Sequence, residues 1–94
     1  MGQYILTNLA ELDLLNIAIY GDATYGVTKS DEYRDALKSQ FQYLADSPLV
    51  HRERDEFSPP VRVSPFKSHV IIYHVTSENM IEIIRVRHGR EDWL

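Results

Sequence analysis

Two runs rich in valine and isoleucine, residues 69–75 and 80–86, lie only four residues apart near the end of the chain. β-branched residues pack well on a pleated surface, so both runs favour strands. The connection, residues 76–79, has a length that antiparallel hairpins use. Because each run is almost continuously apolar, other parts of the protein should cover both of its faces. The sequence therefore predicts a central β-hairpin to which the remaining elements attach.

Residues 9–23 predict a helix with more apolar surface than a single contact needs. Leu12, Leu15 and Ile19 form one stripe at helical spacing. Leu14 and Ile17 widen this stripe beyond a simple amphipathic face. We therefore expect this helix to contact something on two sides.

Polar residues and a glycine mark where the helices begin and end. Asn8 can accept free backbone N–H groups at a helix start, and Tyr25-Gly26 interrupts the helical pattern. Thr28, followed three residues later by Asp31, resembles a capping box that opens a second helix. The two helices should therefore form a hairpin. The second helix has an apolar stripe made of Tyr33, Leu37, Phe41 and Leu44.

The remaining segments complete a sheet. Residues 3–7 are short and β-prone, whereas residues 49–60 are charged, aperiodic and closed by two prolines, which predicts an exposed loop. Val61 and Val63 alternate with polar residues before Pro65, which indicates a short strand near a sheet edge. The predicted fold is a single α+β domain, residues 1–94, with the two-layer order β-α-α-β-β-β and an antiparallel sheet packed against a two-helix hairpin.

Composition excludes several classes of function. The 94 residues include no cysteine, which excludes disulfides, thiolate zinc sites and a cysteine nucleophile. A formal net charge of −4 argues against a protein whose main ligand is a nucleic-acid backbone, so we expect no sequence-specific nucleic-acid binding. No secretory signal pattern is present, and no stretch approaches the roughly 20 apolar residues of a membrane span. We expect a cytoplasmic protein without membrane contact.

Four stretches resemble the ParE toxins of the RelE/ParE superfamily, in order and at the family's intervals. In the second helix, Tyr25-Gly26 precedes Glu32-Tyr33 by six residues, and residues 41–48 read Phe-x-x-Leu-Ala-x-x-Pro. The other three stretches are residues 52–56 (Arg-x-Arg-Asp-Glu), residues 61–73 (Val-Arg-Val-x-Pro, then His-Val-Ile-Ile-Tyr) and residues 84–92 (Ile-Arg-Val-x-His-x-Arg-x-Asp). Two departures stand out: His51 replaces a common glycine, and Arg87 replaces the usual apolar residue.

This resemblance implies the toxin of a type II toxin-antitoxin system. Such a protein would poison DNA gyrase, arrest growth, and be neutralised by a ParD-like antitoxin in a hetero-oligomer. It would be a protein inhibitor and not an enzyme, with no catalytic residue, no metal and no other cofactor. Geometry also disfavours a histidine metal site, because His69 and His74 are five apart on one predicted strand and so face opposite sides.

A group of basic residues is the candidate surface for contact with the target. Arg85 and Arg87 are two apart on or just past a strand and should point the same way. The alternative is that these cations pair with nearby acids, namely Glu53, Glu56, Glu82 and Asp92. The full set of target-contact candidates is Arg62, Arg85, Arg87, His88 and Arg90.

Four apolar residues are the candidates for antitoxin binding. Leu14 and Ile17 are surplus to one helix face, and Val61 and Val63 lie on a strand near an edge. Protein partners often bind by laying an amphipathic helix in a groove and by adding a strand to an edge. The same four residues could equally belong to the core.

Two alternative functions follow from other readings of the sequence. A ribosome-dependent mRNA endoribonuclease of the RelE kind could use Glu56 as base, Arg62 as the stabilising cation and His88 as acid. The net acidity and the tail that continues past His88 weigh against it. An inactive relative that acts only as a binding partner is the second alternative, and it would cause no growth arrest.

Overall fold

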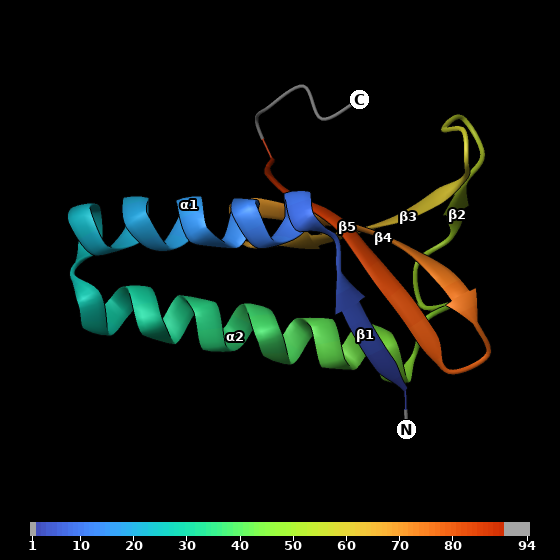
Figure 1. Cartoon of the computed structure of the whole chain (residues 1–94), viewed down its shortest axis with the longest axis horizontal. Coiled ribbons are helices and arrows are strands. Elements are labelled where there is room, and N and C mark those ends of the chain that lie inside the picture. Colours follow the sequence, from blue (N-terminus) through green and yellow to red (C-terminus); the bar gives the residue numbers. More distant parts are fainter. Residues whose placement is uncertain (1, 90–94) are drawn as a thin grey trace.

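Two consecutive helices and five strands make up the described part of the chain (Figure 1). The computed structural model describes residues 2–89. The elements are β1 Gln3–Leu6, α1 Asn8–Tyr25, α2 Val27–Asp46, β2 Glu53–Arg54, β3 Val61–Phe66, β4 His69–Ser77 and β5 Met80–His88. The predicted α+β fold is confirmed. The segment predicted as a plain loop contains the short additional strand β2.

The strands form one sheet in the order β1-β5-β4-β3-β2. Strands β2 to β5 pair antiparallel with their neighbours, but β1 is parallel to β5, so the sheet is mixed and not wholly antiparallel as predicted. The reason is connectivity: two helices and three strands separate β1 from β5, so no tight turn forces the chain to reverse between them. The β4–β5 connection is a two-residue turn, shorter than the predicted four.

The ends of the helices depend on Thr7 and Gly26. The Thr7 hydroxyl accepts the N–H of Ala10 and donates to the carbonyl of Ile84, so Thr7, and not Asn8, caps α1. Gly26 joins the helices with a φ of 89°, where a residue with a Cβ would be strained. The capping box predicted at Thr28 does not form, because α2 begins directly after Gly26 with no side-chain cap.

The main core lies between the helices and one face of the sheet, called here the front face. The predicted stripe of α2 is confirmed, since Leu37, Phe41 and Leu44 are fully buried. They meet residues that alternate along β4 and β5, as expected for side chains sharing one face of a sheet. These strand residues are Ile71, Tyr73, Ile81, Ile83 and Val86.

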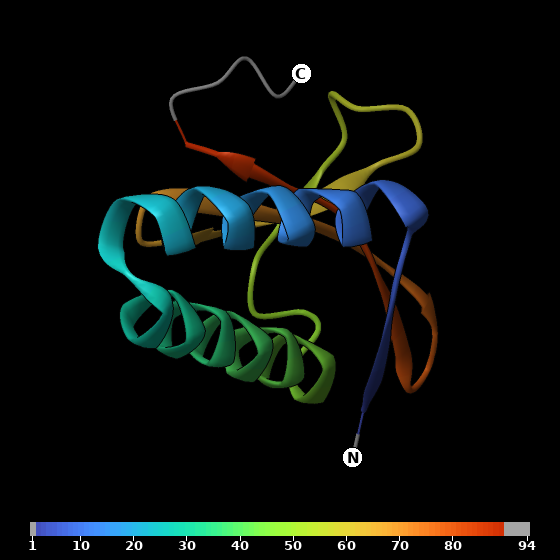
Figure 2. The same ribbon diagram turned by 60° about the vertical axis from the view of Figure 1, so that its left-hand side comes forward.

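The core-facing side of α1 is not the predicted stripe. It consists of Ala10, Leu14, Ile17, Ala18 and Gly21. Small residues occupy this side because the two helices lie closest together near the turn that joins them (Figure 2). A Cβ added at Gly21 would lie 2.7 Å from the Oγ of Ser30 on α2. The predicted stripe therefore faces outward, with exposed fractions of 50% for Leu12, 56% for Leu15 and 59% for Ile19.

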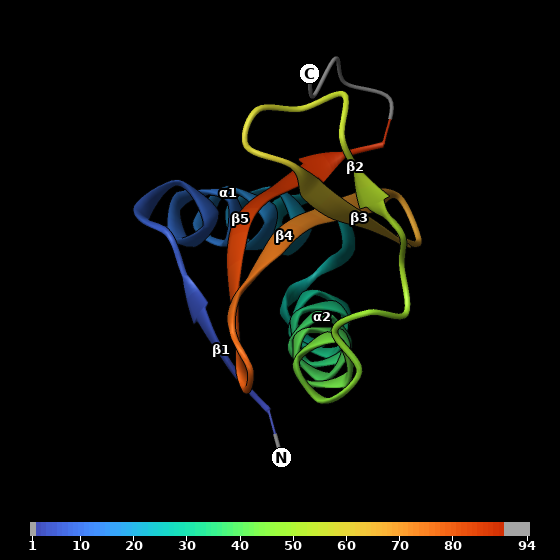
Figure 3. The ribbon, with the colours of Figure 1, turned by 90° about the vertical axis from the view of Figure 1, so that its right-hand side faces the viewer.

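A second, smaller cluster covers the opposite face of the sheet, called here the back face. Val61, Val63 and Ile72 are buried there, with Phe57 packed against them. Figure 3 shows the segment between β2 and β3 rising from the side of the sheet away from α2. Through Phe57, this segment covers the back face of the apolar strands, as the sequence predicted that some part of the protein would. Within residues 2–89, no helix is long and apolar enough to cross a membrane.

Candidate binding site between the first helix and the last strand

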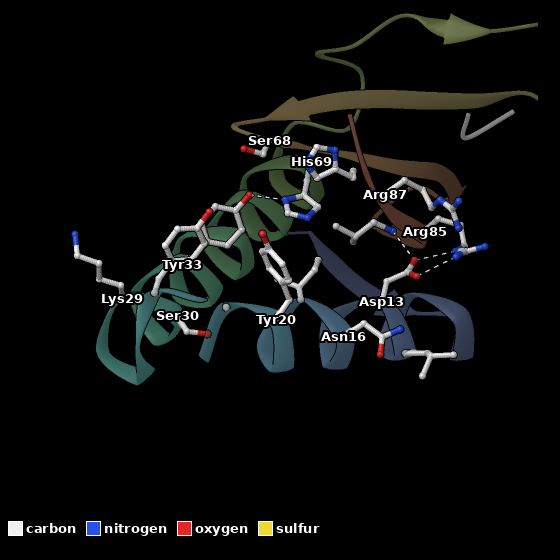
Figure 4. Close-up of a pocket in the computed structure, with 16 residues that line it drawn as sticks. Asp13, Asn16, Tyr20, Lys29, Ser30, Tyr33, Ser68, His69, Arg85 and Arg87 are labelled. Carbon is white, nitrogen blue, oxygen red and sulfur yellow. Dashed lines mark hydrogen bonds and ion pairs between the residues drawn. The ribbon is translucent and has the colours of Figure 1, made fainter. Parts of the chain in front are cut away.

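An ion pair fixes α1 beside β5. Because β1 pairs with β5 only as far as Ile83, the edge of β5 beyond that point faces α1. The carboxylate of Asp13 accepts hydrogen bonds from Arg85 Nε at 2.8 Å, from Arg85 Nη2 at 2.9 Å and from the backbone N–H of Val86 at 3.0 Å (Figure 4). The Asp13 side chain is only 11% exposed. This contact sets the position of the Arg85 guanidinium.

Next to this ion pair is a cavity of about 690 Å³. Residues from α1, the start of α2 and the ends of β4 and β5 line it. Its size falls within the range of ligand-binding clefts. Among the described residues, its cationic side chains are Lys29, Arg85 and Arg87, and Asp13 is its acidic one. Its aromatic side chains are Tyr20, Tyr25, Tyr33, His69 and His88.

Three of the rings that line the cavity, Tyr33, His69 and His88, contact one another in sequence. The hydroxyl of Tyr33 and Nδ1 of His69 share a hydrogen bond of 2.6 Å (Figure 4). The His69 and His88 rings meet edge to face with centroids 5.4 Å apart. Burial raises the pKa of Tyr33 above its usual value, an effect that a backbone hydrogen bond at Ser68 partly offsets. The Tyr33 hydroxyl therefore stays neutral while it shares its hydrogen bond with His69.

The structure brings together three of the five target-contact candidates. Arg85, Arg87 and His88 all line the cavity, and the register places Arg85 opposite Ile72 and Arg87 opposite Val70, so both arginines leave β5 on the same side as predicted. Arg62 lies apart from them. Arg90 lies outside the described residues.

Arg62 lies on the front face of the sheet, whereas Arg85 and Arg87 lie opposite Ile72 and Val70 of the back-face cluster. Arg62 pairs in register with Tyr73, and its Nη1 donates to the carbonyl of His51 at 2.6 Å. The Tyr73 hydroxyl donates to the carbonyl of Pro48 at 3.0 Å. Burial raises the pKa of Tyr73, and nearby Arg62 offsets part of the rise. Arg62 and Tyr73 thus hold the chain segment that follows α2.

Two of the acids expected near the arginines, Glu56 and Glu82, have other contacts, and Asp92 lies outside the described residues. Glu56 accepts from Arg54 Nε at 3.0 Å, and Glu82 lies 2.7 Å from His74 Nε2. A backbone hydrogen bond and the bond from Arg54 lower the pKa of Glu56. Asp13, which sequence reasoning missed, is the carboxylate that binds Arg85. The available signal was a single acid inside the apolar run of residues 12–15.

The four antitoxin-binding candidates are largely interior residues. Leu14 and Ile17 pack half-buried against the main core, and Val61 and Val63 are only 7% and 9% exposed. Their role in antitoxin binding stays a prediction. The exposed apolar residues of α1 lie on the other side of the helix, and we call them the outer stripe: Leu9, Leu12, Leu15 and Ile19.

Among residues 2–89, no cluster of three or more histidine or acidic side chains could hold a metal ion. His69 contacts Tyr33 and His88, whereas His74 contacts Glu82. These two histidines therefore have separate structural contacts, in keeping with their odd spacing along β4.

A two-helix hairpin on a mixed sheet is a fold that this chain shares with a known structure. A solved structure described as "Chromosomal ParDE TA system from P. aeruginosa" superposes with a TM-score of 0.78 at 20% identity, covering 94% of this chain and 96% of that chain. That likeness shows the fold.

The family model described as "ParE toxin of type II toxin-antitoxin system, parDE" matches residues 4–93. The chain is 33% identical to Toxin ParE1 of Mycobacterium tuberculosis, over 97% of this chain and 93% of that protein. It is 30% identical to Toxin ParE1 of Caulobacter vibrioides, over 94% of this chain and 90% of that protein. The chain therefore belongs to the ParE toxin family of type II toxin-antitoxin systems.

Proposed function

We propose that this toxin poisons DNA gyrase in the cytoplasm and that a ParD-like antitoxin silences it by direct binding. The observation that carries the proposal is the match to the ParE family over residues 4–93, almost the full chain. The toxin acts as a protein inhibitor: it binds gyrase, disturbs strand passage and lets cleaved DNA accumulate. The basic residues at the end of β5, Arg85, Arg87 and His88, together with Arg90 in the tail, are the proposed target contacts.

Geometry favours this inhibitor over a ribosome-dependent nuclease. A nuclease of that kind would need Glu56, Arg62 and His88 around one phosphate. Arg62 lies opposite Tyr73 and His88 lies opposite His69, so the two are separated by roughly 13 Å along β4 alone. Glu56 bonds to Arg54, which lies opposite Val61 of the back face. No common phosphate position is available to these three groups.

The outer stripe of α1 supports the proposed antitoxin contact. Its four apolar residues recur at helical spacing, and they remain exposed while the core is already complete. A partner helix that buries such a stripe gains apolar contact without disturbing the toxin's fold. We therefore place the antitoxin helix on the outer stripe. The antitoxin would then contact the exposed side chains of the outer stripe and not Val61 and Val63, which are buried.

The gyrase proposal is tested with purified toxin, gyrase, relaxed plasmid and ATP, scoring supercoiling and trapped cleavage products together. We expect loss of supercoiling, linear DNA, and reversal by the antitoxin. Arg87→Ala and Arg90→Ala should weaken the poisoning by about tenfold each, the effect of losing one charged contact of roughly 1.4 kcal/mol. Arg34→Ala, which removes an arginine of α2 paired with Asp31, is the matched control and should leave activity unchanged.

Growth arrest in cells whose gyrase remains unhindered would show that the gyrase proposal is wrong. Messenger RNA from such cells would then be mapped for ribosome-dependent cleavage. A toxin that neither inhibits gyrase nor arrests growth would be an inactive relative that acts only through its partner.

A further inference from the structure

The turn between β3 and β4 holds a lysine in a backbone conformation that favours glycine. Lys67 and Ser68 form this two-residue connection, and Lys67 has a φ of 53°. Tight hairpin turns usually place glycine, asparagine or aspartate at a positive φ, because other side chains meet steric strain there. Backbone strain of this kind gathers at functional sites, so Lys67 is a candidate for a role outside the fold.

The contacts of Lys67 within the protein are weak. Its Nζ lies 5.6 Å from the centre of the Tyr33 ring and 5.7 Å from that of the Phe66 ring. An exposed ammonium gains little from such contacts, because water competes for the same charge. None of the ion pairs formed within residues 2–89 includes Lys67, which is itself exposed. Its positive charge is therefore accessible to a partner.

The turn lies directly beside the end of β5, where the proposed target contacts begin. His69, the first residue of β4, pairs in register with His88, and the backbone N–H of Gly89 donates to the carbonyl of Ser68 at 2.8 Å. Lys67, Ser68, His88 and Gly89 together line a hollow of about 480 Å³. Lys67 therefore shares one surface with His88, although the two are far apart in the sequence.

Packing against α2 fixes the position of this turn. The Tyr33 ring lies 5.6 Å from that of Phe66, centroid to centroid, and its hydroxyl shares a hydrogen bond of 2.6 Å with His69. Figure 4 shows Tyr33, Ser68 and His69 together at this corner of the molecule. Because residues before and after Lys67 are held by α2, the turn loses little freedom when a partner binds.

We propose that Lys67 is a further contact to gyrase and that its ammonium meets a carboxylate of that protein. This inference rests on the proposed target, and it extends the basic surface at the end of β5 to the neighbouring turn. The alternative anion is a phosphate of the DNA that gyrase holds, which the formal charge of −4 of the whole chain disfavours. An exposed charge pair of this kind mainly speeds association and orients the toxin.

Two lysines provide a matched test of this contact. Lys38 is also exposed, but it lies on α2 five residues beyond Tyr33, roughly 140° around the helix from the side that meets the turn. Lys67→Gln and Lys38→Gln remove the same charge. In the gyrase assay, the toxin concentration that halves supercoiling should rise about fivefold for Lys67→Gln and stay unchanged for Lys38→Gln. Lys67→Arg keeps the charge and should inhibit as the wild type does.

Glycine at this position separates backbone strain from function. Lys67→Gly lacks the ammonium, as Lys67→Gln does, but only glycine adopts the positive φ without strain. Lys67→Gly should therefore melt a few degrees above Lys67→Gln, while both inhibit gyrase equally weakly. A lower melting temperature for Lys67→Gly would contradict the strain at Lys67. Full inhibition by Lys67→Gly would show that the lysine makes no target contact.

Binding with and without DNA identifies the anion that Lys67 meets. Calorimetry measures the affinity of each variant for the gyrase holoenzyme, alone and with a bound DNA fragment. A deficit of Lys67→Gln that is already present without DNA, and that shrinks at high salt, supports a carboxylate of gyrase. A deficit that appears only with DNA would overturn the carboxylate and indicate a phosphate.

Failure of the target and failure of the contact give different results. If the wild-type toxin leaves gyrase unhindered, the proposed target is wrong and the Lys67 contact with it. If the wild type inhibits while Lys67→Gln and Lys38→Gln behave alike, the contact is overturned and the proposed target stands. Weaker inhibition confined to the Lys67 variants without a charge, with full inhibition by Lys67→Arg, supports the contact.

Discussion

Asp13 of α1 holds Arg85 of β5 through two hydrogen bonds, although the residues are 72 positions apart in the sequence. The same carboxylate accepts the backbone N–H of Val86, so a single side chain joins the first helix to the last strand. Arg85, one of the candidate target contacts, is therefore oriented by α1, the helix that also carries the outer stripe. The position of the Arg85 guanidinium relative to α1 therefore depends on Asp13.

Removing this carboxylate should destabilise the fold. Asp13→Ala leaves Arg85 and the N–H of Val86 without that partner in a largely buried position, and we expect a loss of about 2 kcal/mol. Urea unfolding measures the change. Asp31→Ala removes the acid of the exposed pair with Arg34 and should cost less than about 0.5 kcal/mol. Equal losses for the two variants would mean that the Asp13 contacts contribute no more than a surface pair.

The close approach of the two helices at Gly21 should tolerate no large side chain. A Cβ added at Gly21 would lie 2.7 Å from Ser30 Oγ and 3.2 Å from Ser30 Cβ. Gly21→Leu would push the helices apart and should cost about 3 kcal/mol in the free energy of unfolding. Ala23→Leu, two residues further along α1 at an exposed position, is the control and should be nearly neutral. Thermal unfolding of both variants would reveal the difference, and a stable Gly21→Leu protein would contradict the packing described.

Tyr73 should make the protein sensitive to alkali. Burial raises its pKa in the folded state, so the unfolded chain releases the proton first once the pH exceeds about 10. The unfolded state then binds fewer protons than the folded state, and stability falls as pH rises. Tyr73→Phe removes this dependence but loses the hydrogen bond to Pro48, at a cost of about 1 kcal/mol near neutral pH.

The stability gap between wild type and Tyr73→Phe should therefore narrow above pH 10. Denaturant unfolding at neutral and alkaline pH measures it. Tyr20→Phe, at an exposed tyrosine of α1, is the control and should parallel the wild type throughout. A gap that stays constant with pH would show that Tyr73 is not the titrating group.

The outer stripe should affect antitoxin binding but not folding. Leu12→Glu combined with Leu15→Glu places charges on side chains that are already half exposed, so the melting temperature should change little. Antitoxin affinity should fall at least about a hundredfold, because two apolar anchors at the centre of an interface are lost. Leu49→Glu alters an exposed leucine away from α1 and should bind as the wild type does. Unimpaired binding by the double variant would move the antitoxin contact elsewhere.

Much of the architecture follows from local patterns in the sequence. The stripe of Leu37, Phe41 and Leu44 has only one apolar side to bury, so its orientation was predictable. The Ile- and Val-rich strands β4 and β5 pair as neighbours because the short turn between them brings the chain straight back alongside itself. Gly26 ends α1 for a local steric reason that acts in any context.

Tertiary structure decided what local patterns left ambiguous. α1 is apolar on two sides, and its sequence favours neither; close packing at Gly21 selects the side with small residues and leaves Leu12, Leu15 and Ile19 exposed. The partner of Arg85 could not be read from neighbouring acids, because Asp13 meets it only after β5 and α1 come together. Sequence thus determined the elements and their order, whereas the pairing of distant side chains required the fold, since contacts across 72 residues carry no local signal.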